Sequence, residues 1–150
     1  MKHFLFSLLF LLPAVGFAQN LTFQGVPIDG KLEDFEKQLA DKGVFRDMEK
    51  DANVAGKYYS DSVCLCIGYD YRTRRVGSVS LDYNPEAIPS PKEYLAQLKK
   101  DFTTKYGEPT TTSDEETTWY SWYVKEGTKT IGKISVYGPS PNIGISYEDK

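Results

Sequence analysis

Residues 63–83 read VCLCIGYDYRTRRVGSVSLDY, and this stretch decides the fold. In two parts of it, 63–69 and 75–83, larger apolar side chains alternate with small or polar ones. Because neighbouring side chains on a strand point to opposite sides, a period of two predicts a β-strand with one buried face. The stretch therefore predicts an antiparallel hairpin with one face on the core and one face toward solvent.

Four further segments have the composition of strands, and two have the spacing of helices. The strands are predicted at 54–60, 118–124, 129–137 and 142–147. The helices are predicted at 30–42 and 91–106, where apolar side chains recur every three or four positions. Their apolar stripes are Leu32, Phe35 and Leu39 in the first helix and Leu95, Leu98 and Phe102 in the second. Ser90 and Glu93 have the spacing of a capping box, and Pro91 occupies the first helical position.

Two halves of the chain, about 28–83 and 90–148, show the same order of one helix followed by strands. The helix stripes align at a shift of 63 residues, whereas the hairpins align at a shift of 55. The aligned hairpin segments are 63–67 with 118–122 and 76–80 with 131–135. This similarity predicts an internal repeat, although any two helix-plus-hairpin units look alike at this level. The predicted fold is α+β: two helix-plus-antiparallel-strand repeats form one antiparallel sheet, with both helices packed on one face.

The first eighteen residues, MKHFLFSLLFLLPAVGFA, have the pattern of a signal peptide. A basic start, an apolar stretch and a small-x-small ending predict cleavage between Ala18 and Gln19. The remaining residues, 19–150, are expected to form a single α+β domain that is secreted or periplasmic. No transmembrane segment is expected in it, since no later stretch approaches the roughly 20 apolar residues that a membrane-spanning helix needs.

Composition excludes several classes of function. His3 is the only histidine and leaves with the signal peptide. Nucleophiles activated by histidine and zinc sites with histidine ligands are therefore excluded, and no cofactor is expected. Without Lys2, the chain has 17 basic and 21 acidic side chains, which gives a formal net charge of −4. We do not expect an acidic chain to bind nucleic acid, because proteins that bind nucleic acids carry a basic domain or a basic stripe.

The charged clusters give little support for catalysis. Asp114, Glu115 and Glu116 lie in TTTSDEETT, which we expect to be a solvated, mobile connection. A hydrolase of the glycosidase type needs two carboxylates held apart across a cleft, and adjacent loop residues do not supply that. Basic side chains gather at the two hairpin turns, where they form either an anion site or a plain charged turn. They are Arg72, Arg74 and Arg75 at one turn and Lys125 and Lys129 at the other.

Cys64 and Cys66 form a C-x-C pair on a predicted strand. Their Cα atoms are separated by two strand rises, roughly 6.6 Å, which is near the upper limit for a disulfide. Three interpretations stay open: small sheet residues without further role, a strained or intermolecular disulfide, and a metal or redox site.

Alternation assigns each strand residue to one of two faces. The apolar set, expected under the helices, comprises Leu65, Ile67, Val79, Leu81, Tyr120, Trp122, Ile134, Val136, Ile143 and Ile145. The opposite set comprises Cys64, Cys66, Ser78, Ser80, Asp82, Trp119, Ser121, Tyr123, Lys133, Ser135, Tyr137 and Ser146. Large amphipathic rings among serines indicate a contact surface, unless the rings only cover the sheet. The candidate ligand-binding residues are Trp119, Tyr123, Tyr137 and Lys133.

In its order of elements the chain resembles the architecture of the beta-lactamase inhibitor proteins. It is also similar to small exported α+β proteins of Gram-negative bacteria, whose short leaders end as this one does at Ala18 and Gln19. The resemblance covers residues 19–150 and carries no inhibitory residue over to this chain. It implies a binding or inhibitory module without catalysis.

The sequence thus predicts a non-catalytic exported module whose open sheet face binds a protein or an extended polymer such as a glycan. The alternatives are an envelope assembly or structural factor, a protein with a thiol or metal site, and a carboxylate-based hydrolase.

Overall fold

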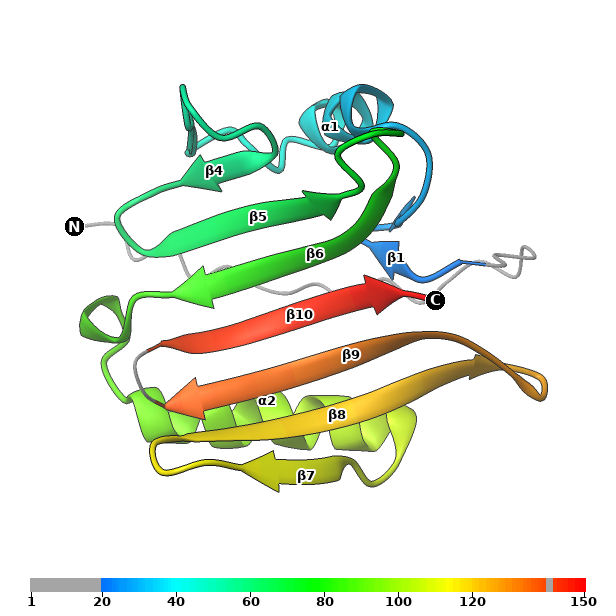
Figure 1. Cartoon of the computed structure of the whole chain (residues 1–150). Coiled ribbons are helices and arrows are strands. Elements are labelled where there is room, and N and C mark those ends of the chain that lie inside the picture. Colours follow the sequence, from blue (N-terminus) through cyan, green and yellow to red (C-terminus); the bar gives the residue numbers. More distant parts are fainter. Residues whose placement is uncertain (1–19, 140–141) are drawn as a thin grey trace.

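The computed structural model describes residues 20–139 and 142–150 (Figure 1). The predicted signal peptide and its cleavage point lie outside the described residues. The described part of the chain is α+β, as predicted, with helices α1 (Leu32–Asp41) and α2 (Pro91–Tyr106) and a short 3₁₀ helix at Pro85–Ala87. None of the helices described has the length and apolar composition needed to cross a membrane.

The main sheet is antiparallel and has eight strands in the order β3-β4-β5-β6-β10-β9-β8-β7. The strands of the first half are β3 (Glu49–Lys50), β4 (Lys57–Tyr59), β5 (Val63–Tyr69) and β6 (Val76–Tyr83). Those of the second half are β7 (Thr110–Ser113), β8 (Thr117–Glu126), β9 (Lys129–Pro139) and β10 (Ile143–Asp149). The last strand of each half meets the other in the centre, so the sheet is continuous across both halves.

This strand order does not match the hairpin alignment at a shift of 55. Counted from the centre, β6 corresponds to β10 and β5 to β9, whereas the alignment places β5 on β8. The mismatch arises because the alignment places the β5–β6 hairpin on β8–β9, whereas the next strand, β10, is the one that pairs with β6 in the centre. Thr110–Ser113, expected to be part of a mobile connection, is edge strand β7, paired with β8. Asp114 accepts hydrogen bonds from the backbone N–H groups of Glu116 and Thr117 and so shapes the turn that follows. The internal repeat stays a prediction. In such a repeat, β6 would correspond to β10 and β5 to β9, counted outward from the centre of the sheet.

The core lies on one face of the sheet, and the predicted sorting of side chains is confirmed there. Of the ten apolar strand residues expected under the helices, all are buried except Tyr120, which is half-buried. Phe102 of α2 stacks on Trp122 of β8 with ring centroids 5.4 Å apart. The indole N–H of Trp122 donates to the carbonyl of Gly107 at 2.8 Å, which ties the end of α2 to the sheet. The predicted capping box is wrong, because the side chain of Ser90 makes no hydrogen bond that caps the helix.

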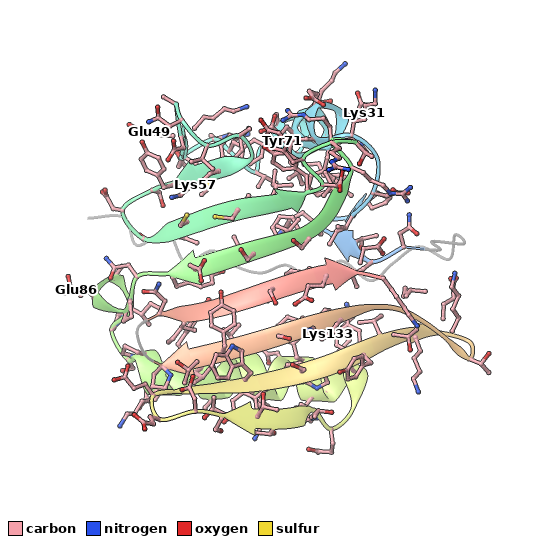
Figure 2. All side chains as sticks on the ribbon, in the orientation of Figure 1. Lys31, Glu49, Lys57, Tyr71, Glu86 and Lys133 are labelled. Atoms are coloured by element: carbon pink, nitrogen blue, oxygen red, sulfur yellow. The ribbon has the colours of Figure 1, made fainter. Side chains whose placement is uncertain are left out.

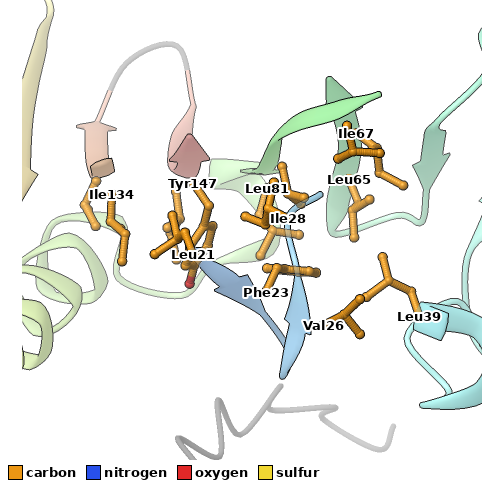
Figure 3. Packing of buried hydrophobic residues seen from close by; sticks show 14 of the residues in the cluster. Leu21, Phe23, Val26, Ile28, Leu39, Leu65, Ile67, Leu81, Ile134 and Tyr147 are labelled. Atoms are coloured by element: carbon orange, nitrogen blue, oxygen red, sulfur yellow. The ribbon is translucent and has the colours of Figure 1, made fainter. Parts of the chain in front are cut away.

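A small hairpin, β1 (Thr22–Phe23) and β2 (Val26–Pro27), packs beneath the central strands between the two helices (Figure 3). Sequence analysis missed it, since two-residue strands show no periodicity. Its turn, Gln24-Gly25, has φ angles of 52° and 74°, the left-handed conformation that a tight hairpin requires. Phe23 is 3% exposed and packs edge-on against Tyr147 of β10, with the two ring centroids 5.4 Å apart. The hairpin therefore completes the core under the junction of the two halves.

We expect Phe23→Ala to lower the free energy of unfolding by about 3–5 kcal/mol, because it leaves a cavity under β10. Tyr71→Ala is the control: Tyr71 is 86% exposed, so its loss should change stability by at most about 0.5 kcal/mol. Urea unfolding followed by circular dichroism measures both. Equal stability of the two variants would show that the hairpin is not part of the core.

Candidate functional site

The sheet face opposite the core, here called the open face, is turned toward the viewer in Figure 1, and α2 lies behind it. No described helix or hairpin lies across it. Figure 2 shows its side chains, with Lys57 near one end of the sheet and Lys133 toward the other. All twelve residues predicted for this face are on it. Most are half-buried, Tyr123 is exposed and Ser135 is buried.

Hydroxyl groups cross the middle of the open face in a line, which we call the serine row. It consists of Ser80, Ser146, Ser135 and Ser121, each paired in register with the next on β6, β10, β9 and β8. Cys66 and Thr110 extend the row to β5 and β7. At a strand spacing of about 4.8 Å, the row from β5 to β7 is about 24 Å long. The hydroxyls of Ser121 and Ser135 are hydrogen-bonded at 2.8 Å.

Aromatic side chains border one side of the serine row. Trp119 of β8 is paired with Tyr137 of β9, and Tyr137 is paired with Gly144 of β10. A Cβ at position 144 would overlap the phenol ring of Tyr137, so the glycine lets this ring lie flat across β10. The hydroxyl of Tyr137 then donates a hydrogen bond to the carboxylate of Asp82 on β6. Burial raises the pKa of Tyr137 above its usual value, and the hydrogen bond to Asp82 raises it further. Tyr137 is thus held in a fixed position.

An ion pair and an exposed ring border the other side of the serine row. Lys133 of β9 forms an ion pair of 3.2 Å with Glu148 of β10, which stands opposite it. Tyr123 of β8 is paired with Lys133 and is 57% exposed. The four predicted ligand-binding residues therefore form two cross-strand pairs on β8 and β9, one on each side of Ser121 and Ser135. Trp119 and Tyr123, four residues apart on one strand, are separated by roughly 13 Å.

The thiols occupy the opposite end of the open face. Cys64 and Cys66 of β5 are half-buried, and neither is in a disulfide. Their Sγ atoms are 3.6 Å apart. Burial, with the hydrogen bond to Cys64 adding to it, raises the pKa of the Cys66 thiol to about 11.

Sequence analysis did not assign roles to two residues of this face. From the sequence, Asp82 is placed on this face without a partner, and Gly144 is not singled out. Only the strand register, which places both between Cys64 and Tyr137, brings them into contact with the aromatic residues. A glycine inside a strand is the one available signal, because it marks a close approach of another group.

Two arginines at the turn between β5 and β6 are engaged in ion pairs. Arg74 is paired with Glu33 at 2.5 Å, and Arg75 is paired with Asp29 at 2.7 Å. This arrangement favours the charged-turn interpretation over an anion site. Among the residues that the structure describes, no three His, Cys, Asp or Glu side chains are grouped so that they could hold a metal.

Comparison of the chain with family models, with curated proteins and with solved structures finds no match. The resemblance to beta-lactamase inhibitor proteins accordingly stays a prediction.

Tyr137→Phe tests the anchoring of the aromatic border. Loss of the hydrogen bond to Asp82 should lower the free energy of unfolding by about 1 kcal/mol at pH 7. A phenol whose pKa is higher in the folded state than in the unfolded state stabilises the fold. This stabilisation is fully present below the pKa of the unfolded state, about 10, and is lost as the pH rises toward the pKa of the folded state. The difference in the free energy of unfolding between the wild type and the variant should therefore become smaller above pH 10. A difference that stays constant from pH 7 to pH 11.5 in chemical unfolding would contradict this.

Proposed function

We propose that the protein is an exported, non-catalytic binding or inhibitory module that holds a protein or an extended polymer, such as a glycan, on its open face. The observation that carries this proposal is the arrangement of the open face. Two aromatic-bearing pairs flank a hydroxyl row there, and no described element covers this face of the sheet. The exposed side of an antiparallel sheet needs only small polar side chains to stay solvated. Trp119 and Tyr123 are larger than that role requires.

The shape of the open face favours an extended or broad partner. Sites for small molecules are concave and enclose most of the ligand, whereas a sheet face offers a wide and shallow surface. Tryptophan and tyrosine combine a large apolar area with a hydrogen-bonding group, which is why they dominate contact energies at such surfaces. The serine row supplies donors and acceptors between the two rings. A glycan, with apolar ring faces and many hydroxyls, uses both kinds of group, and so does a protein loop or strand.

Charge agrees with a partner other than nucleic acid. The chain is acidic overall, and the ammonium of Lys133, the one lysine among the candidate binding residues, is already paired with Glu148. The proposal also includes the signal peptide of residues 1–18 and the two repeats, with β6 and β10 as equivalent strands.

The combined replacement Trp119→Ala, Tyr123→Ala and Tyr137→Ala should abolish partner capture, because it removes both aromatic borders. The measurement is a pull-down from envelope extract together with a glycan array, with bound components identified by mass spectrometry. Tyr71→Ala, which changes an exposed ring at the β5–β6 turn, should capture the same partner as the wild type.

Thermal unfolding accompanies this experiment, so that loss of fold is distinguished from loss of contact. If the triple variant unfolds, the double variant Trp119→Ala with Tyr123→Ala is used in its place, because neither of these residues makes the hydrogen bond to Asp82. Unchanged capture by a folded variant would contradict the proposal. Loss of capture in Thr111→Lys, on edge strand β7, with retention in the aromatic variants would place the contact at the sheet edge instead.

A further inference from the structure

The thiols of Cys64 and Cys66 converge on the open face, on a strand that carries none of the four candidate ligand-binding residues. They lie on β5, four strands from β8, which corresponds to about 19 Å. Both belong to one strand at positions i and i+2, so their side chains point the same way. Their Sγ atoms are 3.6 Å apart, and both side chains are half-buried, so small ions can reach them.

We propose that Cys64 and Cys66 form a two-thiolate site for a thiophilic monovalent cation, Cu(I) or Ag(I). Thiolates are soft ligands and select soft cations. A structural zinc site needs four ligands, and no third His, Cys, Asp or Glu side chain joins the pair among the described residues. A d¹⁰ monovalent cation is satisfied by two sulfurs, so it fits the donor set that the strand supplies.

The geometry requires a small adjustment. Two metal–thiolate bonds of about 2.3 Å in a line separate the sulfurs by about 4.6 Å. The thiols must therefore open by about 1 Å from their 3.6 Å separation, and rotation about the two Cα–Cβ bonds supplies this. A disulfide makes the opposite demand. The sulfurs would have to close to about 2.05 Å, while the Cα atoms of an extended i, i+2 pair lie near the upper limit for such a bond. The strand thus favours a bridging ion over a covalent bond.

The surroundings of the pair affect the charge that forms when the cation binds. Both side chains are half-buried, so a charge on the sulfurs is stabilised only if a counter-charge lies nearby. On binding, each thiol releases its proton to water and donates a sulfur electron pair to the cation, which keeps its oxidation state. The product carries one net negative charge. Lys57 of β4, opposite Cys66, stabilises this charge. The other titratable groups around the pair are Tyr59 of β4 and Asp82 of β6, both opposite Cys64, and the phenol of Tyr137.

The test is a titration of the reduced protein with Cu(I) in the absence of oxygen, in competition with a chromogenic Cu(I) chelator. Ag(I) serves as a second probe that does not change oxidation state. We expect one cation per chain and the release of two protons per cation. Cys64→Ser and Cys66→Ser should each weaken binding by a factor of roughly 10²–10⁴, since each removes one of the two linked ligands. Ser80→Ala, which changes the neighbour of Cys66 on β6, should bind as the wild type does.

Three results would overturn the site. They are the absence of a one-to-one complex, equal affinity in a single serine variant and the wild type, and one cation shared by two chains. Recovery of the exported chain with Cys64 and Cys66 already joined in a disulfide would also overturn it. The double variant Trp119→Ala with Tyr123→Ala, which leaves Tyr137 and Asp82 in place, should keep its Cu(I) affinity. Failure of the binding proposal and failure of this one are therefore distinguishable.

Discussion

Antiparallel pairing of β6 with β10 is the constraint on which the rest of the structure depends. Six residue pairs, from Ile143 with Tyr83 to Glu148 with Ser78, hold the two halves in one register. A slip of one residue would move every side chain of one half to the wrong face. Because the register is fixed, the buried apolar side chains of the six strands from β4 to β8 lie on one face, and α1, α2 and the β1–β2 hairpin cover that face. The other face is left with serines, thiols and aromatic rings.

Much of this was predictable because alternation is a local property of the chain. The placement of Trp122 in the core and Trp119 on the open face follows from their odd spacing, and both positions are confirmed. The elements that sequence analysis missed are those without a periodic signal. The two-residue strands β1 and β2 carry none, and Thr110–Ser113 becomes a strand only because β8 offers it an edge. Its composition alone resembles that of a loop.

The site shows the same division between local and long-range information. Tyr137 and Trp119 could be assigned to the open face from their own strands, but their surroundings could not. Asp82 is 55 residues from Tyr137 in the sequence, and the pairing of β6, β10 and β9 brings the two into hydrogen-bond contact. Gly144 makes room for the ring between them. As a result, the open face has two separate chemical ends, one aromatic and one sulfur-bearing, joined by the serine row.

The central claim is that the two faces differ in exposure, and the two tryptophans report it directly. Acrylamide quenching of fluorescence is measured for the wild type and for Trp119→Phe, in which only Trp122 emits. The variant should show blue-shifted emission that acrylamide hardly quenches. The signal lost from the wild type belongs to Trp119, which is half-buried. It should be red-shifted relative to the emission of Trp122 and quenched more readily. A strongly quenched Trp122 or a protected Trp119 would contradict the account.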